Sequence, residues 1–249
     1  MPRAARPPRF YFSLRSPYNF FALHDLRAHH PDVLDRLDWR PFWEPDETSQ
    51  KQLAESGAEF PYTPMTRAKQ FYILRDVRRL AAARSLALTW PVDADPWWEP
   101  AHLTWFVAER QGLGRAWVER AGRARWLEGR DICDPATVRE LAADIGLDAD
   151  AVDGAVTDPG IRAQGAKALL DVVRDGVFGV PYFINGSEPY WGLDRLPDFV
   201  ASLPQDAPPV SLPQTAPPVS LPRTASPAAD VTSPFPGRTS DLSHAGGCG

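Results

Sequence analysis

Cysteine is almost absent from this chain. Cys133 and Cys248 are the only two among 249 residues, and they lie far apart in the sequence. A dithiol redox site is therefore excluded, and a structural disulfide is not expected. We interpret Cys133 as a small, buried or half-buried residue near the start of a helix.

Long apolar runs, a strong net charge and clustered metal ligands are absent too. No segment approaches the roughly 20 apolar residues that a membrane span needs, and the basic first residues lack the apolar stretch of a secretory signal. The net charge of −5 disfavours a nucleic-acid or anionic-membrane partner. Histidines show no metal-binding spacing at positions 24, 29, 30, 102 and 244. We expect a cytoplasmic protein without metal that acts on a small-molecule substrate, with a homodimer left open.

What the chain does contain is enough apolar sequence for a large core. The hydrophobic content is 43%, with nine tryptophans. The aromatic, alternating segment 9–14 predicts a strand, and Ser16 with Pro17 predicts the start of a helix after it. Segment 38–43 predicts a second strand, parallel to the first if the helix between them packs on the sheet. This opening is typical of an α/β fold.

The middle of the chain is predicted to be helical. Apolar residues recur at helical spacing, broken by Gly, Pro and Asp, in segments 66–85, 97–110, 114–128, 135–145 and 159–175. Segments 181–185 and 188–191 predict a hairpin across Asn185-Gly186, and a last helix is expected from Leu193 to about Leu203. We therefore expect an all-helical insertion, about 64–158, between two sheet-forming ends.

The two termini have a different composition. Residues 1–8 are expected to be flexible. Residues 204–249 are rich in proline and carry a nonapeptide repeat, Ser-Leu-Pro-Gln-x-Ala-Pro-Pro-Val, that begins at Ser202 and again at Ser211. Such a sequence is extended or disordered, and serves either as a docking segment or as an idle tail.

Ser16 is the first candidate functional residue. Unpaired N–H groups and the positive end of the helix dipole meet at a helix start, so an anion such as a thiolate is stabilised there. A serine hydroxyl adds one more hydrogen bond. Ser-Pro is also a common helix opening, so a capping role alone stays open.

Val180-Pro181 is the second candidate. The pair stands between a glycine-containing loop and a strand, where an edge position or a cis bond is favoured. Beside a helix start, such a bond leaves the backbone before the proline available to pair with a ligand as an added strand does.

Four motifs in order then resemble a known family. They are Phe10-Tyr-Phe-x-x-x-Ser16-Pro-Tyr18, Lys69-x-x-Tyr72-x-x-x-Asp76, Gly176-Val-Phe-Gly-Val-Pro181 and Trp191-Gly-x-Asp194-Arg195-Leu196. Over residues 9–203 the chain resembles 2-hydroxychromene-2-carboxylate isomerase and the kappa-class glutathione transferases, in the DsbA-like thioredoxin-fold superfamily. The resemblance implies a thioredoxin-like α/β fold with an inserted all-helical domain.

The resemblance also implies a site for glutathione or another low-molecular-weight thiol. Ser16 would face the thiol as the catalytic residue, and the Val180 backbone would pair with its cysteinyl part, with Pro181 in the cis form. Asp194 and the Leu193 backbone would hold the γ-glutamyl end. Further site candidates are Lys69, Arg15, Tyr18 and Tyr72. For Asp76 a packing or capping role stays open, and for Arg195 a supporting salt bridge.

The implied activity is a thiol-dependent isomerase or transferase for a conjugated or aromatic small molecule. The family usually has Asp where Ser13 stands, and Arg15 beside it either adds positive charge near the substrate or points to solvent. The loop at 56–64 lacks the family's thiol-contacting Asn. A non-catalytic thiol- or peptide-binding module remains an alternative, and a disulfide oxidoreductase is disfavoured by serine at position 16.

Overall fold

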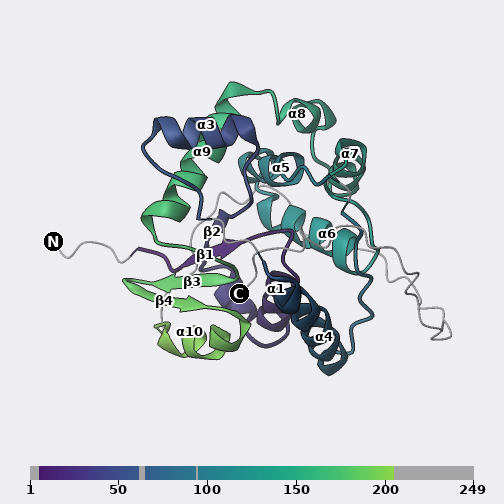
Figure 1. Cartoon of the computed structure of the whole chain (residues 1–249), viewed down its shortest axis with the longest axis vertical. Helices are drawn as coiled ribbons and strands as arrows, with labels where there is room; N and C mark the ends of the chain where they lie inside the picture. Colours follow the sequence, from purple (N-terminus) through teal and green to yellow (C-terminus); the bar gives the residue numbers. More distant parts are fainter. Residues whose placement is uncertain (1–5, 62–64, 94, 205–249) are drawn as a thin grey trace.

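The two ends of the folded region build one mixed sheet (Figure 1). The computed structural model describes residues 6–61, 65–93 and 95–204. Strand β1 (Arg9–Phe12) pairs in parallel with β2 (Asp38–Pro41) and antiparallel with β3 (Tyr182–Asn185). Strand β4 (Glu188–Trp191) pairs with β3 as a hairpin at the edge. The predicted parallel pair and the predicted hairpin are both confirmed.

Alternation along β1 divides the core between the two sheet faces. Phe10 and Phe12 belong to the largest cluster of buried apolar residues, whereas Tyr11 belongs to a second cluster. Phe10 stacks on Phe183 with ring centroids 4.7 Å apart, and Phe183 stacks on Phe199 at 4.6 Å. These three rings connect β1, β3 and the C-terminal helix α10 (Leu196–Ser202).

Helices connect the strands along the chain and also follow the last strand. Helices α1 (Pro17–His29) and α2 (Pro31–Leu34) join β1 to β2, and the short η1 (Leu193–Arg195) precedes α10. Between β2 and β3 lie α3 (Glu47–Glu55), α4 (Arg67–Ala83), α5 (Glu99–Arg110), α6 (Gly114–Trp126), α7 (Pro135–Asp144), α8 (Ala149–Gly154) and α9 (Pro159–Arg174). The five helices predicted here are all present, with ends that differ by at most two residues.

The sequence did not predict the short helices α2, α3 and α8. Helix α3 buries only Ser49 and Leu53, so its apolar pattern is weak, but the Asp46 carboxylate caps it by accepting from the Ser49 N–H at 2.8 Å. Helix α8 likewise buries only Val152 and is capped by Asp148. Capping and packing on neighbours stabilise these helices, and periodicity does not reveal them.

Helix α5 is the centre of the helical region. It packs against α6, α7, α8 and α9, and every residue from Glu99 to Ala108 is buried (Figure 1). A helix that is buried all round holds its polar side chains in fixed positions. None of the described helices is long and apolar enough to cross a membrane. The predictions for the two termini fall outside the described residues, except at 6–8 and Pro204.

Candidate functional site

Ser16 caps helix α1, as predicted. Its backbone is extended, with φ −86° and ψ 122°, and Pro17 follows at the first helical position. The Ser16 Oγ accepts a hydrogen bond from the Asn19 N–H at 3.2 Å, and the residue is 1% exposed. The hydroxyl therefore stands at the positive end of α1, shielded from bulk water.

A cavity of about 250 Å³ opens beside this cap, between α1 and α6. Ser16 and Asn19 line it, together with apolar side chains of Phe12, Leu14, Phe20, Leu23, Leu86, Val118 and Trp126. Arg27 and Arg123, which also line it, are exposed, so they stand where the cavity meets solvent. The cavity is an apolar space with a few polar groups near the helix start.

The loop before Ser16 is held by His102 of α5. The His102 Nε2 accepts from the Leu14 N–H at 3.2 Å and lies 3.4 Å from the Ser13 Oγ. The Nδ1 atom lies 2.8 Å from the Trp98 carbonyl oxygen, to which a protonated Nδ1 donates. A side chain of the helical region thus fixes the turn that leads into the cap.

His102 is a neutral imidazole at ordinary pH. Complete burial, with the positive charges of Arg125 and Arg15, lowers the pKa of His102 to about 3. The Trp43 ring stacks on the imidazole with centroids 5.5 Å apart, and its indole N–H donates to Glu99. Neutrality is what allows Nε2 to accept from Leu14.

Glu99 is a second buried titratable group of α5. It is 0% exposed, and burial raises the pKa of Glu99 to about 7. Its carboxylate accepts from the Ser49 hydroxyl at 2.5 Å and lies 3.4 Å from an Arg162 nitrogen. These contacts join α3, α5 and α9 around Glu99.

Arg15 is buried, so the alternative that it points to solvent is wrong. Its side chain is 9% exposed and pairs with Glu44 at 2.8 Å. The Arg15 guanidinium lies 5.3 Å from the Trp98 ring centroid, and the Arg125 guanidinium lies 4.9 Å from the same ring. Arg15 therefore places a positive charge close to the loop before Ser16, among aromatic and basic side chains.

Helix α4 contacts α1 through Tyr18. The Tyr18 hydroxyl donates to Asp76 Oδ2 at 2.9 Å, which gives Asp76 a packing role between the two helices. Tyr72 is 59% exposed, with the Arg79 guanidinium 5.7 Å from its ring centroid. Lys69, in the first turn of α4, is also exposed. The side chains of Lys69 and Tyr72 thus lie at the surface of α4.

The second candidate segment has the expected backbone. The Val180-Pro181 bond is cis, and Val180 is 1% exposed. The Gly192 N–H donates to the Pro181 carbonyl oxygen at 2.9 Å, which ties this loop to the segment after β4. The structure therefore connects the predicted Val180-Pro181 and Leu193-Asp194 elements through one backbone hydrogen bond.

Leu193 and Asp194 border a different hollow from the one beside Ser16. This hollow, of about 440 Å³, is also lined by Asp25 and Arg84 at the far ends of α1 and α4. The Asp194 side chain is 76% exposed, and its carboxylate lies 3.7 Å from the Arg195 guanidinium. Ser16 and Asp194 thus face separate spaces.

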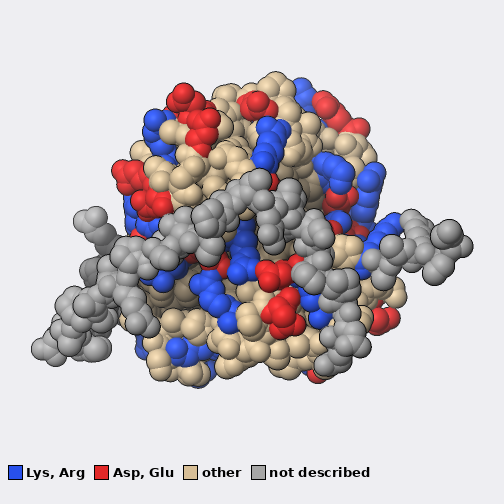
Figure 2. Space-filling view, turned by 180° about the vertical axis from the view of Figure 1, so that it is seen from behind, with Lys and Arg blue, Asp and Glu red and all other residues tan. Residues whose placement is uncertain are grey.

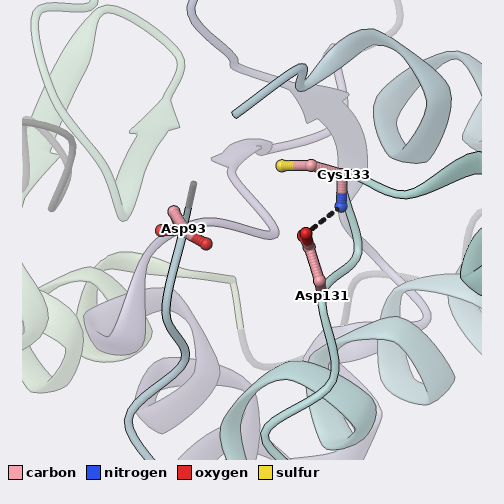
Figure 3. Close-up of side chains that lie close together, drawn as sticks. All are labelled: Asp93, Asp131 and Cys133. Carbon is pink, nitrogen blue, oxygen red and sulfur yellow. Dashed lines mark hydrogen bonds between the residues drawn. The ribbon is translucent and has the colours of Figure 1, made fainter. Parts of the chain in front are cut away.

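Cys133 sits beside two carboxylates (Figure 3). Burial raises the pKa of the Cys133 thiol, and the charges of Asp131 and Asp93 raise it further. Asp131 accepts from the Cys133 N–H at 2.8 Å, and both Asp93 oxygens accept from Arg125. The cluster therefore secures Arg125 and this loop, and the thiol is a poor nucleophile.

The sequence did not predict two residues of the site, Asn19 and His102. Asn19 follows the cap by three residues, a position that gives no distinctive signal. His102 was considered only as a metal ligand, whereas its observed partners are backbone groups of Leu14 and Trp98. Only its place among the apolar residues of a helical segment hinted at a buried polar role.

Comparisons with known proteins agree with this architecture. A model of the DSBA-like thioredoxin domain matches residues 9–203. The chain is 32% identical over 197 residues to 2-hydroxychromene-2-carboxylate isomerase of Sphingobium xenophagum, an alignment that covers 78% of this chain and 95% of the relative.

Solved structures extend the comparison at the level of the fold. A crystallised 2-hydroxychromene-2-carboxylate isomerase superposes with a TM-score of 0.59 at 22% identity, covering 78% of this chain and 93% of that one. A probable DsbA oxidoreductase from Streptomyces coelicolor gives 0.58 at 20% identity, covering 82% and 92%. The cytosolic disulfide reductase DsbM of Pseudomonas aeruginosa with GSH gives 0.52 at 21% identity, covering 78% and 95%.

Proposed function

The chain belongs to the DSBA-like thioredoxin family, and we propose that it is an enzyme like 2-hydroxychromene-2-carboxylate isomerase, using a small thiol on a conjugated or aromatic molecule. The observation that carries the proposal is the position of Ser16. Its hydroxyl lies at the start of α1 and lines an apolar cavity of about 250 Å³. The site therefore combines a helix start that stabilises an anion with a cavity that accepts an apolar molecule.

The residues present fit a thiol such as glutathione at this helix start. A thiolate there meets the positive end of the α1 dipole, and the Ser16 O–H is a hydrogen-bond donor of the right kind for sulfur. Under the proposal, the backbone of Val180 before cis-Pro181 pairs with the thiol's peptide part. Asp194 and Leu193, which the resemblance assigns to the ammonium end, border the separate hollow beside Asp25 and Arg84, so the geometry of the Ser16 cavity does not support that assignment. Lys69, exposed in the first turn of α4, is the further candidate for contact with the thiol.

A bound thiol supplies a nucleophile that adds reversibly to a conjugated double bond, so that the bond rotates before elimination restores it. The chain's own contribution is electrostatic. The α1 terminus and Ser16 hold negative charge on sulfur, and buried Arg15 adds positive charge beside the loop. The apolar walls between α1 and α6 exclude water from the reacting group. A transferase uses the same arrangement but releases the conjugate without elimination.

Disulfide exchange fits this site poorly. Serine stands at the helix start, and the pKa of the Cys133 thiol is raised by burial and by neighbouring carboxylates. On the face drawn in Figure 2, basic and acidic side chains are interspersed, which suits a small substrate better than a nucleic acid. We place the protein in the cytoplasm as part of the same proposal.

Calorimetry with glutathione, and then with other cellular thiols, tests the proposal. Wild type should bind one of them, and Ser16→Ala should bind it roughly 10 to 100 times more weakly, the usual effect of losing a hydrogen bond to a charged group. Ser16→Asp is the matched variant, because aspartate still caps α1 but repels a thiolate. It should fold as stably as Ser16→Ala or better, and still fail to bind.

Ultraviolet absorbance of the bound thiol near about 240 nm, where thiolates absorb, then reports its ionisation. The thiolate band should persist to lower pH in wild type than in Ser16→Ala. If wild type binds no thiol, the proposed function is wrong. Identical thiolate titrations in wild type and Ser16→Ala would show that Ser16 does not stabilise the thiolate and has no catalytic role.

A further inference from the structure

Asn19 carries a buried amide that has no partner among the described residues. The residue is 2% exposed, and its Oδ1 and Nδ2 atoms both lack a hydrogen bond there. The chain's other asparagine behaves differently, since the Asn185 Nδ2 donates to the Ser202 carbonyl oxygen at 2.9 Å. A buried amide without a partner destabilises a fold, so its presence on α1 calls for a role.

The Asn19 amide belongs to the wall of the cavity beside Ser16. Trp126, on the facing helix α6, lines the same cavity, and its buried indole Nε1 also lacks a partner among the described residues. Polar groups from α1 and α6 therefore line one largely apolar space. A concave apolar site with a few converging polar groups is how proteins bind small organic molecules.

Gly122 keeps the α6 wall of this cavity open. It lies inside a helix, where glycine is less stable than alanine. A Cβ at this position would lie 3.4 Å from Phe20 Cδ2, so an alanine fits, but its methyl group would take up space in the cavity. The helix thus keeps a residue that weakens it and leaves room beside Phe20, in the cavity that Asn19 also lines.

We propose that Asn19 is a specificity-determining residue, whose amide hydrogen-bonds a hydroxyl or carbonyl group on an aromatic ring held in this cavity. The inference rests on the proposed function in taking this cavity as the substrate site beside Ser16. An aromatic hydroxyl accepts from Nδ2 or donates to Oδ1. A methyl group in its place leaves the amide unpaired, and sites built to bind a hydroxyl reject such analogues.

The test compares 2-naphthol with 2-methylnaphthalene, which has nearly the same shape. Binding is measured by equilibrium dialysis, without thiol and without turnover. Wild type should bind 2-naphthol about tenfold more tightly. Asn19→Leu should lose this preference and melt at a higher temperature, because it removes an unpaired buried amide. The matched control Asn185→Leu should keep the preference and melt at a lower temperature, because it removes a formed hydrogen bond.

A second pair of variants locates the ligand. Gly122→Ala should weaken the binding of both naphthalenes. Gly154→Ala, whose added methyl group meets nothing within 4 Å, should leave binding unchanged. These variants keep the test valid if Asn19→Leu does not fold.

The proposal is overturned if wild type binds neither naphthalene, if it binds both equally, or if Asn19→Leu keeps the preference. Failure here with thiol binding intact rejects the role of Asn19 alone. A confirmed naphthol preference with no thiol binding rejects the proposed function and leaves Asn19 as a ligand-binding residue.

Discussion

Lowering the pH from 7 to 5 should reduce the contribution of His102 to stability, while Glu99, whose pKa is raised to about 7, acts in the opposite direction because its folded form binds a proton first. The imidazole is 0% exposed, and burial, with the charges of Arg125 and Arg15, lowers the pKa of His102 to about 3 from an ordinary 6.5. Because the folded-state pKa is the lower one, the unfolded chain binds the proton first. The stability is fully present above pH 6.5 and is lost as the pH falls toward 3.

The size of the effect follows from the two pKa values. Protonation stabilises the unfolded chain by RT ln(1 + 10^(pKa − pH)), about 2.1 kcal/mol at pH 5 and about 0.2 kcal/mol at pH 7 for an ordinary histidine. The folded state gains almost nothing over this range. His102 alone should therefore reduce the free energy of unfolding by about 2 kcal/mol between pH 7 and pH 5.

Urea unfolding at pH 7, 6 and 5 measures this for wild type and His102→Gln. The variant should be less stable at pH 7, because it loses the stacking on Trp43, but it should lose about 2 kcal/mol less on acidification. His29→Gln, which removes an exposed imidazole from α1, is the control and should follow wild type. If His102→Gln and wild type lose the same free energy between pH 7 and pH 5, the buried neutral histidine is not what the structure indicates.

Two further substitutions test the packing around the site. Arg125→Met should destabilise the fold by about 3–5 kcal/mol in chemical denaturation, because it leaves the nearly buried Asp93 carboxylate unpaired; a loss below about 1 kcal/mol would contradict this. Gly165→Ala should lower the melting temperature, since the new Cβ would lie 2.8 Å from Leu103 Cδ2. Gly154→Ala has open space and should raise the melting temperature slightly; equal shifts in both variants would refute the close approach at Gly165.

The sequence was sufficient for the parts of the fold that depend on local patterns. Strand β1, the start of α1 at its Ser16 cap, the hairpin of β3 and β4, and the longer helices follow from alternation, helical spacing and turn residues. Motif order added the thioredoxin-like architecture with a helical region between the sheet-forming ends, and the family match over residues 9–203 confirms it. Helix α3 was missed because a terminal cap and tertiary packing, rather than periodicity, stabilise it.

The sequence alone therefore determined that a serine, and not a cysteine, caps helix α1 at the candidate site. It could do so because a helix cap depends on the residues next to the helix start. Tertiary structure decided what surrounds that serine. Only folding brings His102 of α5 against the Leu14 N–H, buries Arg15 beside Trp98, and leaves a cavity between α1 and α6 with the Asn19 amide in its wall. These contacts join segments some 80 to 100 residues apart, and burial and pKa depend on such long-range packing. No periodicity within a single segment encodes them.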